Sequence, residues 1–430
     1  PSFSQRKIRN HFFKQRSFEK YLYATMPEFK TILDSPTVYR TQIYFSKIKR
    51  DENGKVKFTD YHFKKHDLYY YPASCVKLPV IADAIKIEDR RSIKECRGQC
   101  ILKDEEISSP LKNRILIEDT SYCGFAGQTE IQNGWELGEY VKRMLVVSNN
   151  ICFNPLYEIY QRQHYKMITN HTTRIQQRFN YACDSTANAK LFPCSMISGD
   201  TFKIREKKVA IKNYPLDNNW ATAGLRYLDA KDSLINHPKS FAKSNYISLE
   251  NLQKLFKNIV ADKIDIRKED RNFLLKYMSI YPSECRHPAY DAKEYPDNWG
   301  KYLLIGDDTN FHKSPVHQLQ SLSIGEGKGE VAKEKLMQWA DDSIRIFNKV
   351  GMAYGFLTDC AYIVDYKNQV EFIVSASVFV DRDGTLNDGK YAYKEIGLPF
   401  LGKLGRVLLQ HELKHKRKSK FAAPKMEYND

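Results

Sequence analysis

Residues 68–87 read LYYYPASCVKLPVIADAIKI, and this stretch carries the pattern from which the fold can be inferred. Its second half is apolar on nearly all sides, as expected of a helix buried inside a protein. Ser74 and Lys77 lie three residues apart where this helix begins, so both side chains lie on one face, one turn apart. A partly desolvated lysine loses its proton more easily and can then take the proton of the serine hydroxyl. The helix N-terminus favours the developing negative charge. The stretch therefore predicts a nucleophilic serine beside its base.

The S-x-x-K spacing alone is weak evidence, because the chain also has it elsewhere. Further instances are Ser4/Lys7, Ser46/Lys49, Ser109/Lys112 and Ser240/Lys243. Ser74 differs from these serines because it alone opens a long buried apolar helix. We expect most of the other pairs to be coincidences on the surface.

A second polar motif ends the apolar stretch Leu145-Val-Val, where Ser148-Asn149-Asn150 follows. The hydroxyl of Ser148 could pass a proton to a leaving group, and the amide of Asn150 could hold a substrate carbonyl. A helix cap is the simpler explanation of Ser148 taken alone.

A third motif, Lys349-Val350-Gly351, opens a predicted strand. Its lysine would line a cleft, and its glycine would let a substrate approach the strand backbone. An ordinary strand-end lysine is the alternative. Lys403-Leu-Gly405 repeats the pattern on the predicted last helix, where we expect it to serve packing. The order of the three motifs, in compatible local structure, favours function.

In this order, Ser74-x-x-Lys77, Ser148-x-Asn150 and Lys349-x-Gly351 resemble the S-x-x-K, S-D-N and K-T-G motifs of class A β-lactamases and penicillin-binding proteins. The surrounding stretches YYYPASCVKLPV, SNNICFNPLYEIY and VGMAYGFLTDCAYIV are similar to a branch of β-lactamase-like serine hydrolases. The similarity covers the opening helix and hairpin and residues 68–90, 140–180 and 345–410. It does not cover residues 200–330.

The resemblance implies a role for each of these residues. Ser74 would be acylated, with Lys77 as its base, Ser148 as the proton relay, Asn150 on the substrate carbonyl and Lys349 as the electrostatic anchor. The backbone N–H groups of Ser74 and Met352 would form the oxyanion hole. Val350, Gly351 and Ala353 would contact the substrate. No cofactor or metal is implied.

The chain departs from the family pattern at two points. Val350 stands where the family usually has a hydroxyl that binds the substrate carboxylate. No clear E-x-x-x-N deacylation motif follows Ser148. Asp184 and Asn188 have the spacing of that pair and are the candidates, with coincidence as the alternative. Both departures predict poor hydrolysis of a β-lactam and leave acylation intact.

The predicted fold class is α/β (α+β), a two-lobed β-lactamase/transpeptidase-like fold. One lobe, residues 1–70 and 330–420, would be an antiparallel sheet flanked by helices. The other, residues 71–329, would be mostly helical, with an enlarged insertion at 200–330; residues 416–430 would be a basic tail. The periodicity predicts helices at 17–34, 135–165, 248–260, 266–278, 330–347 and 398–415 and strands at 38–48, 56–63, 351–366 and 369–381.

Two other motifs are better explained by structure. His411-Glu412-x-x-His415 matches H-E-x-x-H, yet no further His follows, and Glu427 lies in a tail expected to be loose, so we expect no zinc. The run Asp381-Arg-Asp383-Gly-Thr-Leu resembles the nucleophile motif of haloacid-dehalogenase-type phosphatases. Too little chain follows for the sheet that such an enzyme needs, so we expect a turn.

Composition leaves the partners open. The formal net charge of +16 fits nucleic acid, an anionic membrane surface or an acidic polymer, but a basic solvated surface is the simplest explanation, and no RNA-binding signature is present. No apolar run is long enough to span a membrane. Cys96 and Cys100 could close a disulfide loop, and this is left open. We expect a periplasmic or extracytoplasmic protein whose signal peptide has been removed.

Together these observations predict a serine hydrolase or acyltransferase that forms an acyl-enzyme at Ser74. The substrate would be an amide, either a peptidoglycan peptide or a β-lactam. A true class A-like β-lactamase and a non-catalytic penicillin-binding receptor or binding module are the alternatives. A stable acyl adduct with slow or absent turnover would indicate the receptor.

Overall fold

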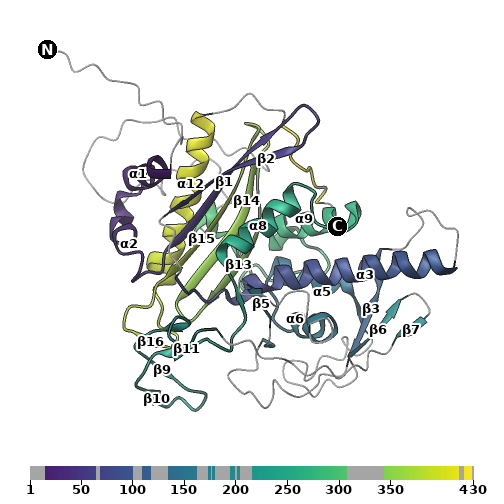
Figure 1. The fold of residues 1–430 in the computed structure, drawn as a ribbon, viewed down its shortest axis with the longest axis horizontal. Helices are drawn as coiled ribbons and strands as arrows, with labels where there is room; N and C mark the ends of the chain where they lie inside the picture. The colour runs from purple at the N-terminus through teal and green to yellow at the C-terminus, as the bar shows by residue number, and fades with distance from the viewer. Residues whose placement is uncertain are drawn as a thin grey trace.

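A five-stranded antiparallel sheet in the order β13-β14-β15-β1-β2 forms the centre of the computed structural model. The structure describes residues 15–63, 68–99, 109–117, 134–161, 173–175, 177–179, 194–198, 201–203, 216–307, 343–415 and 421–428. Strands β1 (Gln42–Arg50) and β2 (Val56–Phe63) come from the first part of the chain. Strands β13 (Ile344–Ala353), β14 (Phe356–Asp365) and β15 (Val370–Phe379) come from the last part. Because β1 pairs with β15, both parts share one sheet, as predicted (Figure 1).

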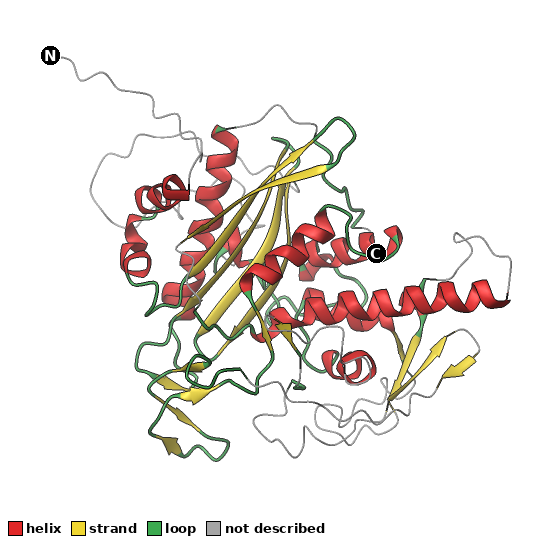
Figure 2. Ribbon diagram, in the orientation of Figure 1, coloured by secondary structure: helices red, strands yellow, loops and turns green. Residues whose placement is uncertain are grey.

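Different helices cover the two faces of this sheet (Figures 1 and 2). Successive residues of a strand point to opposite faces, so Leu357 and Ile363 of β14 join one core cluster and Tyr362 joins the other. The first cluster includes α1 (Gln15–Thr25), α2 (Lys30–Asp34) and α12 (Leu398–Lys414); the second includes α3 (Lys77–Gln99), α8 (Leu249–Val260) and α9 (Lys268–Ser279). Both faces of β14 are buried, and apart from Thr358, Asp359 and the terminal Asp365 its residues are apolar.

The middle of the chain adds further helices and short strands. Helix α5 (Leu137–Val146) is followed by α6 (Phe153–Leu156) and a π-helical turn, Tyr157–Gln161. The helix predicted over 135–165 is thus interrupted, since Ser148 has a positive φ of 58° that no α-helix contains. Four strands form a small sheet in the order β4-β3-β6-β7: β3 (Arg114–Ile117), β4 (Trp135–Glu136), β6 (Cys194–Ser198) and β7 (Thr201–Lys203).

Very short strands and turns occupy most of residues 216–247. They are β8 (Thr222–Ala223), β9 (Arg226–Leu228), β10 (Leu234–Ile235), β11 (Lys239–Ser240) and β12 (Tyr246–Ile247), which pair with one another, with β5 (Thr173–Arg174) and with β16 (Thr385–Leu386). A four-residue helix, α10 (Tyr302–Ile305), packs against α12. Strands of two or three residues are too short for a period to be recognised in the sequence.

The region around Lys349 differs from the prediction. Residues 344–347, predicted as the end of a helix, lie in β13, and 330–342 are outside the described residues. The single strand predicted over 351–366 is a hairpin: Ala353 pairs with Phe356, and Tyr354 and Gly355 have φ values of 53° and 77°. Two positive φ angles match the twist of a two-residue hairpin turn. The apolar residues on both sides hid this turn from the periodicity analysis.

The chain end is packed rather than loose. The hydroxyl of Tyr366 donates to the carbonyl of Pro424 at 2.5 Å, and the hydroxyls of Ser279 and Tyr428 are 2.9 Å apart. The Arg345 guanidinium lies 3.8 Å from the centre of the Tyr428 ring. The expectation of a loose tail around Glu427 is therefore wrong for residues 421–428. Within the described part of the chain, no helix has both the length and the apolar character needed to cross a membrane.

Candidate active site

Ser74 lies in a short 3-10 turn, Ala73–Val76, which runs directly into α3. The residue before it, Ala73, has a φ of 43°. This left-handed conformation costs an L-amino acid about 1–2 kcal/mol. It follows Pro72, whose carbonyl accepts a hydrogen bond from the N–H of Cys75 at 2.9 Å. The strained turn leaves Ser74 half-buried while Cys75 and Val76 are buried.

Lys77 is fully buried, and its Nζ lies among four oxygen atoms. It is 2.9 Å from Ser74 Oγ, 2.6 Å from Asn150 Oδ1 and 3.2 Å from Ser148 Oγ, and it also contacts the Ser148 carbonyl. Burial, followed by the nearby Lys349 ammonium, lowers the pKa of Lys77 well below its usual value. A neutral amine has two N–H donors and one lone pair. It can donate to Asn150 and to the Ser148 carbonyl while it accepts the Ser74 proton.

The loop after α5 brings Ser148 and Asn150 to Lys77. The side chain of Asn149 accepts hydrogen bonds from the N–H groups of Ile151 and Cys152, at 2.8 and 3.1 Å. The left-handed conformation of Ser148 and this small turn direct the residues on both sides of Asn149 toward Lys77. The structure thus brings the predicted Ser-x-Asn motif to the predicted Ser-x-x-Lys motif.

Lys349 reaches the same group from β13, the edge strand of the main sheet. Its Nζ donates to Ser148 Oγ at 2.8 Å and to the Val350 carbonyl at 3.0 Å. The side chain is 2% exposed, and burial lowers the pKa of Lys349 to about 8. The chain Ser74–Lys77–Ser148–Lys349 is therefore continuously hydrogen-bonded, and Ser148 Oγ is the atom that both lysines contact.

Gly351 allows β13 to lie against the Ser74 turn. A Cβ atom at this position would be 2.1 Å from the Pro72 carbonyl oxygen and about 3 Å from Cys75. The protein's own backbone therefore occupies the space on the Cβ side of this glycine. The predicted substrate contact of Gly351 stays a prediction. Val350 packs against the other core cluster, toward Gly300, while Met352 is 41% exposed and Ala353 is half-buried.

We expect Gly351→Ala to separate β13 from the Ser74 turn, because the nearest atom to the new methyl is a backbone oxygen that cannot rotate away. Overpacking of this kind costs about 1–3 kcal/mol of stability. A displacement near 1 Å at a reacting group can cost about 100-fold in rate. The melting temperature and the rate of acylation should both fall.

The control is Gly138→Ala on α5, where the new Cβ would lie no closer than 3.3 Å to its neighbours. This variant should lose far less of both properties than Gly351→Ala, because its nearest neighbour lies 3.3 Å from the new Cβ rather than 2.1 Å. Acylation by Gly351→Ala at the parental rate would contradict the packing argument.

Sequence reasoning missed a buried polar cluster behind Lys349. Asn348 donates to Asp359 at 2.8 Å, and Lys301 donates to Asn348 at 3.0 Å. Burial lowers the pKa of Lys301 to about 7 and raises that of Asp359 to about 6. The cluster also holds the start of α10, since Leu303 N–H donates to Asp359 at 2.9 Å. No sequence motif marks it, because its members come from separate elements.

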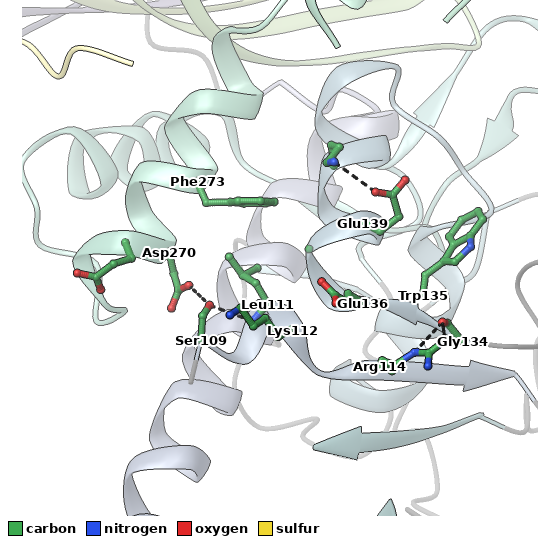
Figure 3. A pocket seen from close by; sticks show the side chains of 13 residues that line it. Ser109, Leu111, Lys112, Arg114, Gly134, Trp135, Glu136, Glu139, Asp270 and Phe273 are labelled. Atoms are coloured by element: carbon green, nitrogen blue, oxygen red, sulfur yellow. Dashed lines mark hydrogen bonds and ion pairs between the residues drawn. The ribbon is translucent and has the colours of Figure 1, made fainter. Parts of the chain in front are cut away.

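The Ser-x-x-Lys pairs of Ser46, Ser109 and Ser240 form no comparable site. Ser46 donates to Asp60 at 2.6 Å, and in a strand a residue three positions on, Lys49, lies on the opposite face. Ser109 lines a pocket of about 670 Å³ between η4 (Pro110–Lys112), α5 and α9, but its hydroxyl donates to Asp270 at 2.5 Å (Figure 3). Ser240 donates to Asn218. Ser4 lies outside the described residues.

The residues of the two motifs set aside above make these contacts within the protein. The ring of His411 stacks on His415 at 4.3 Å, and Glu412 forms an ion pair with Lys47 at 3.3 Å. Asp383 accepts the N–H of Thr385 at 2.8 Å, as in a tight turn. On α12, Gly405 packs directly against Leu304, in agreement with the packing role expected for Lys403-Leu-Gly405.

Some predicted features cannot be placed. Asp184, Asn188 and Cys100 lie outside the described residues, as does the side chain of Cys96. Among the described residues, no group of three His, Cys, Asp or Glu side chains is arranged to hold a metal ion.

Comparison with known proteins gave matches among solved structures only, since neither a protein-family model nor a curated protein matches the chain. It is similar to a β-lactamase from Streptomyces albus G, at 11% identity and a TM-score of 0.43, with 90% of this chain and 99% of that chain covered. It is also similar to a class A β-lactamase from Clostridium kluyveri DSM 555, at 12% identity and a TM-score of 0.43, with 90% of this chain and 99% of that chain covered. The similarity to PBP-A has 12% identity and a TM-score of 0.40, with 90% of this chain and 97% of that chain covered.

Proposed function

We propose that this protein is an active-site serine acyl-transfer enzyme that attacks an amide through Ser74. The observation that carries the proposal is the 2.9 Å contact between Ser74 Oγ and the Nζ of a fully buried Lys77. A serine hydroxyl is a weak nucleophile until an adjacent base takes its proton. Burial lowers the pKa of Lys77 and so favours the neutral form that such a base requires.

In the proposed acylation step, Ser74 Oγ bonds to the carbonyl carbon of the substrate and its proton passes to Lys77 Nζ. The carbonyl electrons move to oxygen, where the N–H groups of Ser74 and Met352 would stabilise the charge. When the tetrahedral intermediate collapses, the C–N bond breaks and the leaving nitrogen takes a proton from Ser148 Oγ. Lys77 returns the proton to Ser148, because its Nζ lies 3.2 Å from that hydroxyl.

Lys349 supplies positive charge at the far end of this chain. Its ammonium holds Ser148 Oγ at 2.8 Å and would attract a substrate carboxylate. A β-lactam or a peptidoglycan peptide has both the amide and the carboxylate that this arrangement suits. Such a substrate is met outside the cytoplasm, so we place the activity in the periplasm or outside the cell.

The proposal predicts that the rate of acylation depends on pH through the protonation states of Lys77 and Lys349. Lys77 must be neutral and Lys349 charged, so the rate should rise from acid pH as Lys77 loses its proton. It should fall as the pH passes about 8, where Lys349 loses its proton. Because the two lysines interact, the apparent pKa values of the acid and alkaline limbs of the rate profile describe the pair of lysines and not either lysine alone. Acylation rates measured from pH 5 to 10 should give a bell-shaped profile.

Lys349→Arg is the matched variant for the alkaline limb, because arginine keeps its charge throughout this range. Its profile should stay high above pH 8. A parental rate that is constant between pH 7 and pH 10 would argue against the role of Lys349.

The experiment that tests the proposed function is intact-mass measurement after incubation with a penicillin. We expect one covalent adduct with the mass of the whole drug, because opening a β-lactam ring releases no leaving group. Rapid loss of the adduct with hydrolysis of a chromogenic cephalosporin would favour the β-lactamase alternative. No adduct with any β-lactam or fluorophosphonate would refute the acyl-transfer proposal.

A further inference from the structure

Three successive residues, Gln177, Arg178 and Phe179, are each fixed by a different part of the protein. Asn245 bonds to both the N–H and the carbonyl of Gln177, at 2.8 Å each. Arg178 forms a buried ion pair with Glu158 at 2.5 Å. Asn154 bonds to both backbone groups of Phe179, at 3.0 and 3.2 Å. Four part-buried hydrogen bonds and one buried ion pair fix the position of this segment.

The segment places the Phe179 ring over the amine of Lys77. The ring centre lies 4.6 Å from Nζ, and the edge of Phe153 supports the ring at a centroid distance of 4.8 Å. Oxygens of Ser74, Ser148 and Asn150 lie at hydrogen-bonding distance from the same Nζ. Nζ therefore has these oxygens as hydrogen-bonding partners and an apolar ring beside them.

Hydrolysis of an acyl-enzyme needs a water molecule that a base can activate. The water oxygen would bond to the acyl carbon, the bond to Ser74 Oγ would break, and Oγ would regain a proton from water through the base. A bound water needs two to four polar partners and enough space. The Phe179 ring offers no strong hydrogen-bonding partner at the amine and fills the space beside it.

We propose that Phe179 is a positioning residue that keeps water from Lys77 and so makes the Ser74 acyl-enzyme long-lived. The inference rests on the proposed acyl transfer. It adds that the acyl group, once on Ser74, is released to water slowly. Phe179 acts through Lys77 in both halves of the reaction. A dry Lys77 is a better base for Ser74, and without a water beside it Lys77 cannot start hydrolysis of the acyl group.

Opening this cover should therefore change the two rates in opposite directions. In Phe179→Ala, water reaches Lys77, which relieves its desolvation and moves its pKa back toward the ordinary value. Less neutral amine is then present near pH 7, so acylation slows and the acid limb of its pH profile moves to higher pH. Deacylation quickens by about 10- to 100-fold, the lower range of what general-base catalysis supplies. Structural damage alone would slow both steps.

The experiment uses the full chain and a penicillin as the acylating probe. Intact mass follows the rise of the adduct from pH 5 to 10 and its decay after the free drug is removed. Phe179→Ala and Phe179→Gln open the cover, the second without a large loss of volume. Phe179→Leu keeps an apolar cover and should restore a long-lived adduct. Phe58→Ala is the matched control, because Lys257 lies 4.9 Å from the Phe58 ring in the same kind of contact away from Ser74.

We expect a long-lived adduct in the parent, the Leu variant and the Phe58 control, and a short-lived one in the Ala and Gln variants. A long-lived adduct in a folded Ala or Gln variant would overturn the role of Phe179. Rapid turnover by the parent would also overturn the role of Phe179, but it would agree with the acyl-transfer proposal. Failure of the parent to form any adduct would instead refute the proposed function itself.

Discussion

Ser74→Ala is expected to abolish covalent labelling by every β-lactam or fluorophosphonate that labels the parent protein. The Oγ atom is the one that forms the proposed bond, and the neighbouring hydroxyl of Ser148 cannot take its place without moving. Ser148 Oγ is held by Lys349 at 2.8 Å and serves the proton relay in the proposed step. Intact mass should show no adduct above the detection limit after a long incubation.

The matched control for Ser74→Ala is Ser109→Ala. Ser109 has the same Ser-x-x-Lys spacing and lines a pocket, yet its hydroxyl bonds to Asp270 (Figure 3). Labelling should remain at the parental level in this variant. An adduct that persists in Ser74→Ala, or a labelled peptide containing Ser109 or Ser240, would show that the nucleophile has been assigned wrongly.

Lys77→Met is expected to slow acylation by about 100- to 10,000-fold, which is what a positioned general base contributes. Methionine keeps most of the length and the apolar stem of lysine but has no basic nitrogen. Lys77→Arg should be equally slow, since arginine can donate hydrogen bonds but stays charged and cannot accept the Ser74 proton. The second-order acylation rate constants of both variants, with melting temperatures to confirm folding, test this point.

The control is Lys112→Met, which removes the exposed lysine of the Ser109 pair. It should acylate at the parental rate. If Lys77→Arg retained near-parental acylation, Lys77 would act as a hydrogen-bond donor or an electrostatic group, and another base would have to be sought.

Local patterns in the sequence were sufficient to predict the β1–β2 hairpin, its place in a sheet with the last part of the chain, and a candidate nucleophile. The continuous apolar run after Lys77 predicts a buried helix, and the alternation and turn signals near residues 38–63 predict the β1–β2 hairpin. Both signals depend only on residues a few positions apart, so a single sequence carries them. The order of the three polar motifs then predicted that Ser74, Lys77, Ser148, Asn150 and Lys349 share one site, and the structure places them within hydrogen-bonding distance of one another.

Other features depend on contacts between segments far apart in the chain, and only the tertiary structure decided them. Position 351 requires glycine because of Pro72, which lies 279 positions earlier. Hydrogen bonds with Asn154 hold Phe179 in place, and the Phe179 ring lies against Lys77. The sequence pattern did not reveal the β13–β14 turn, because strands buried on both faces lack the alternation of polar and apolar residues that would show where one strand stops and the next starts. The sequence by itself determined which residues we predict to react, since that prediction depends on local spacing. The tertiary structure decided what surrounds them, since packing brings together side chains with no pattern in common.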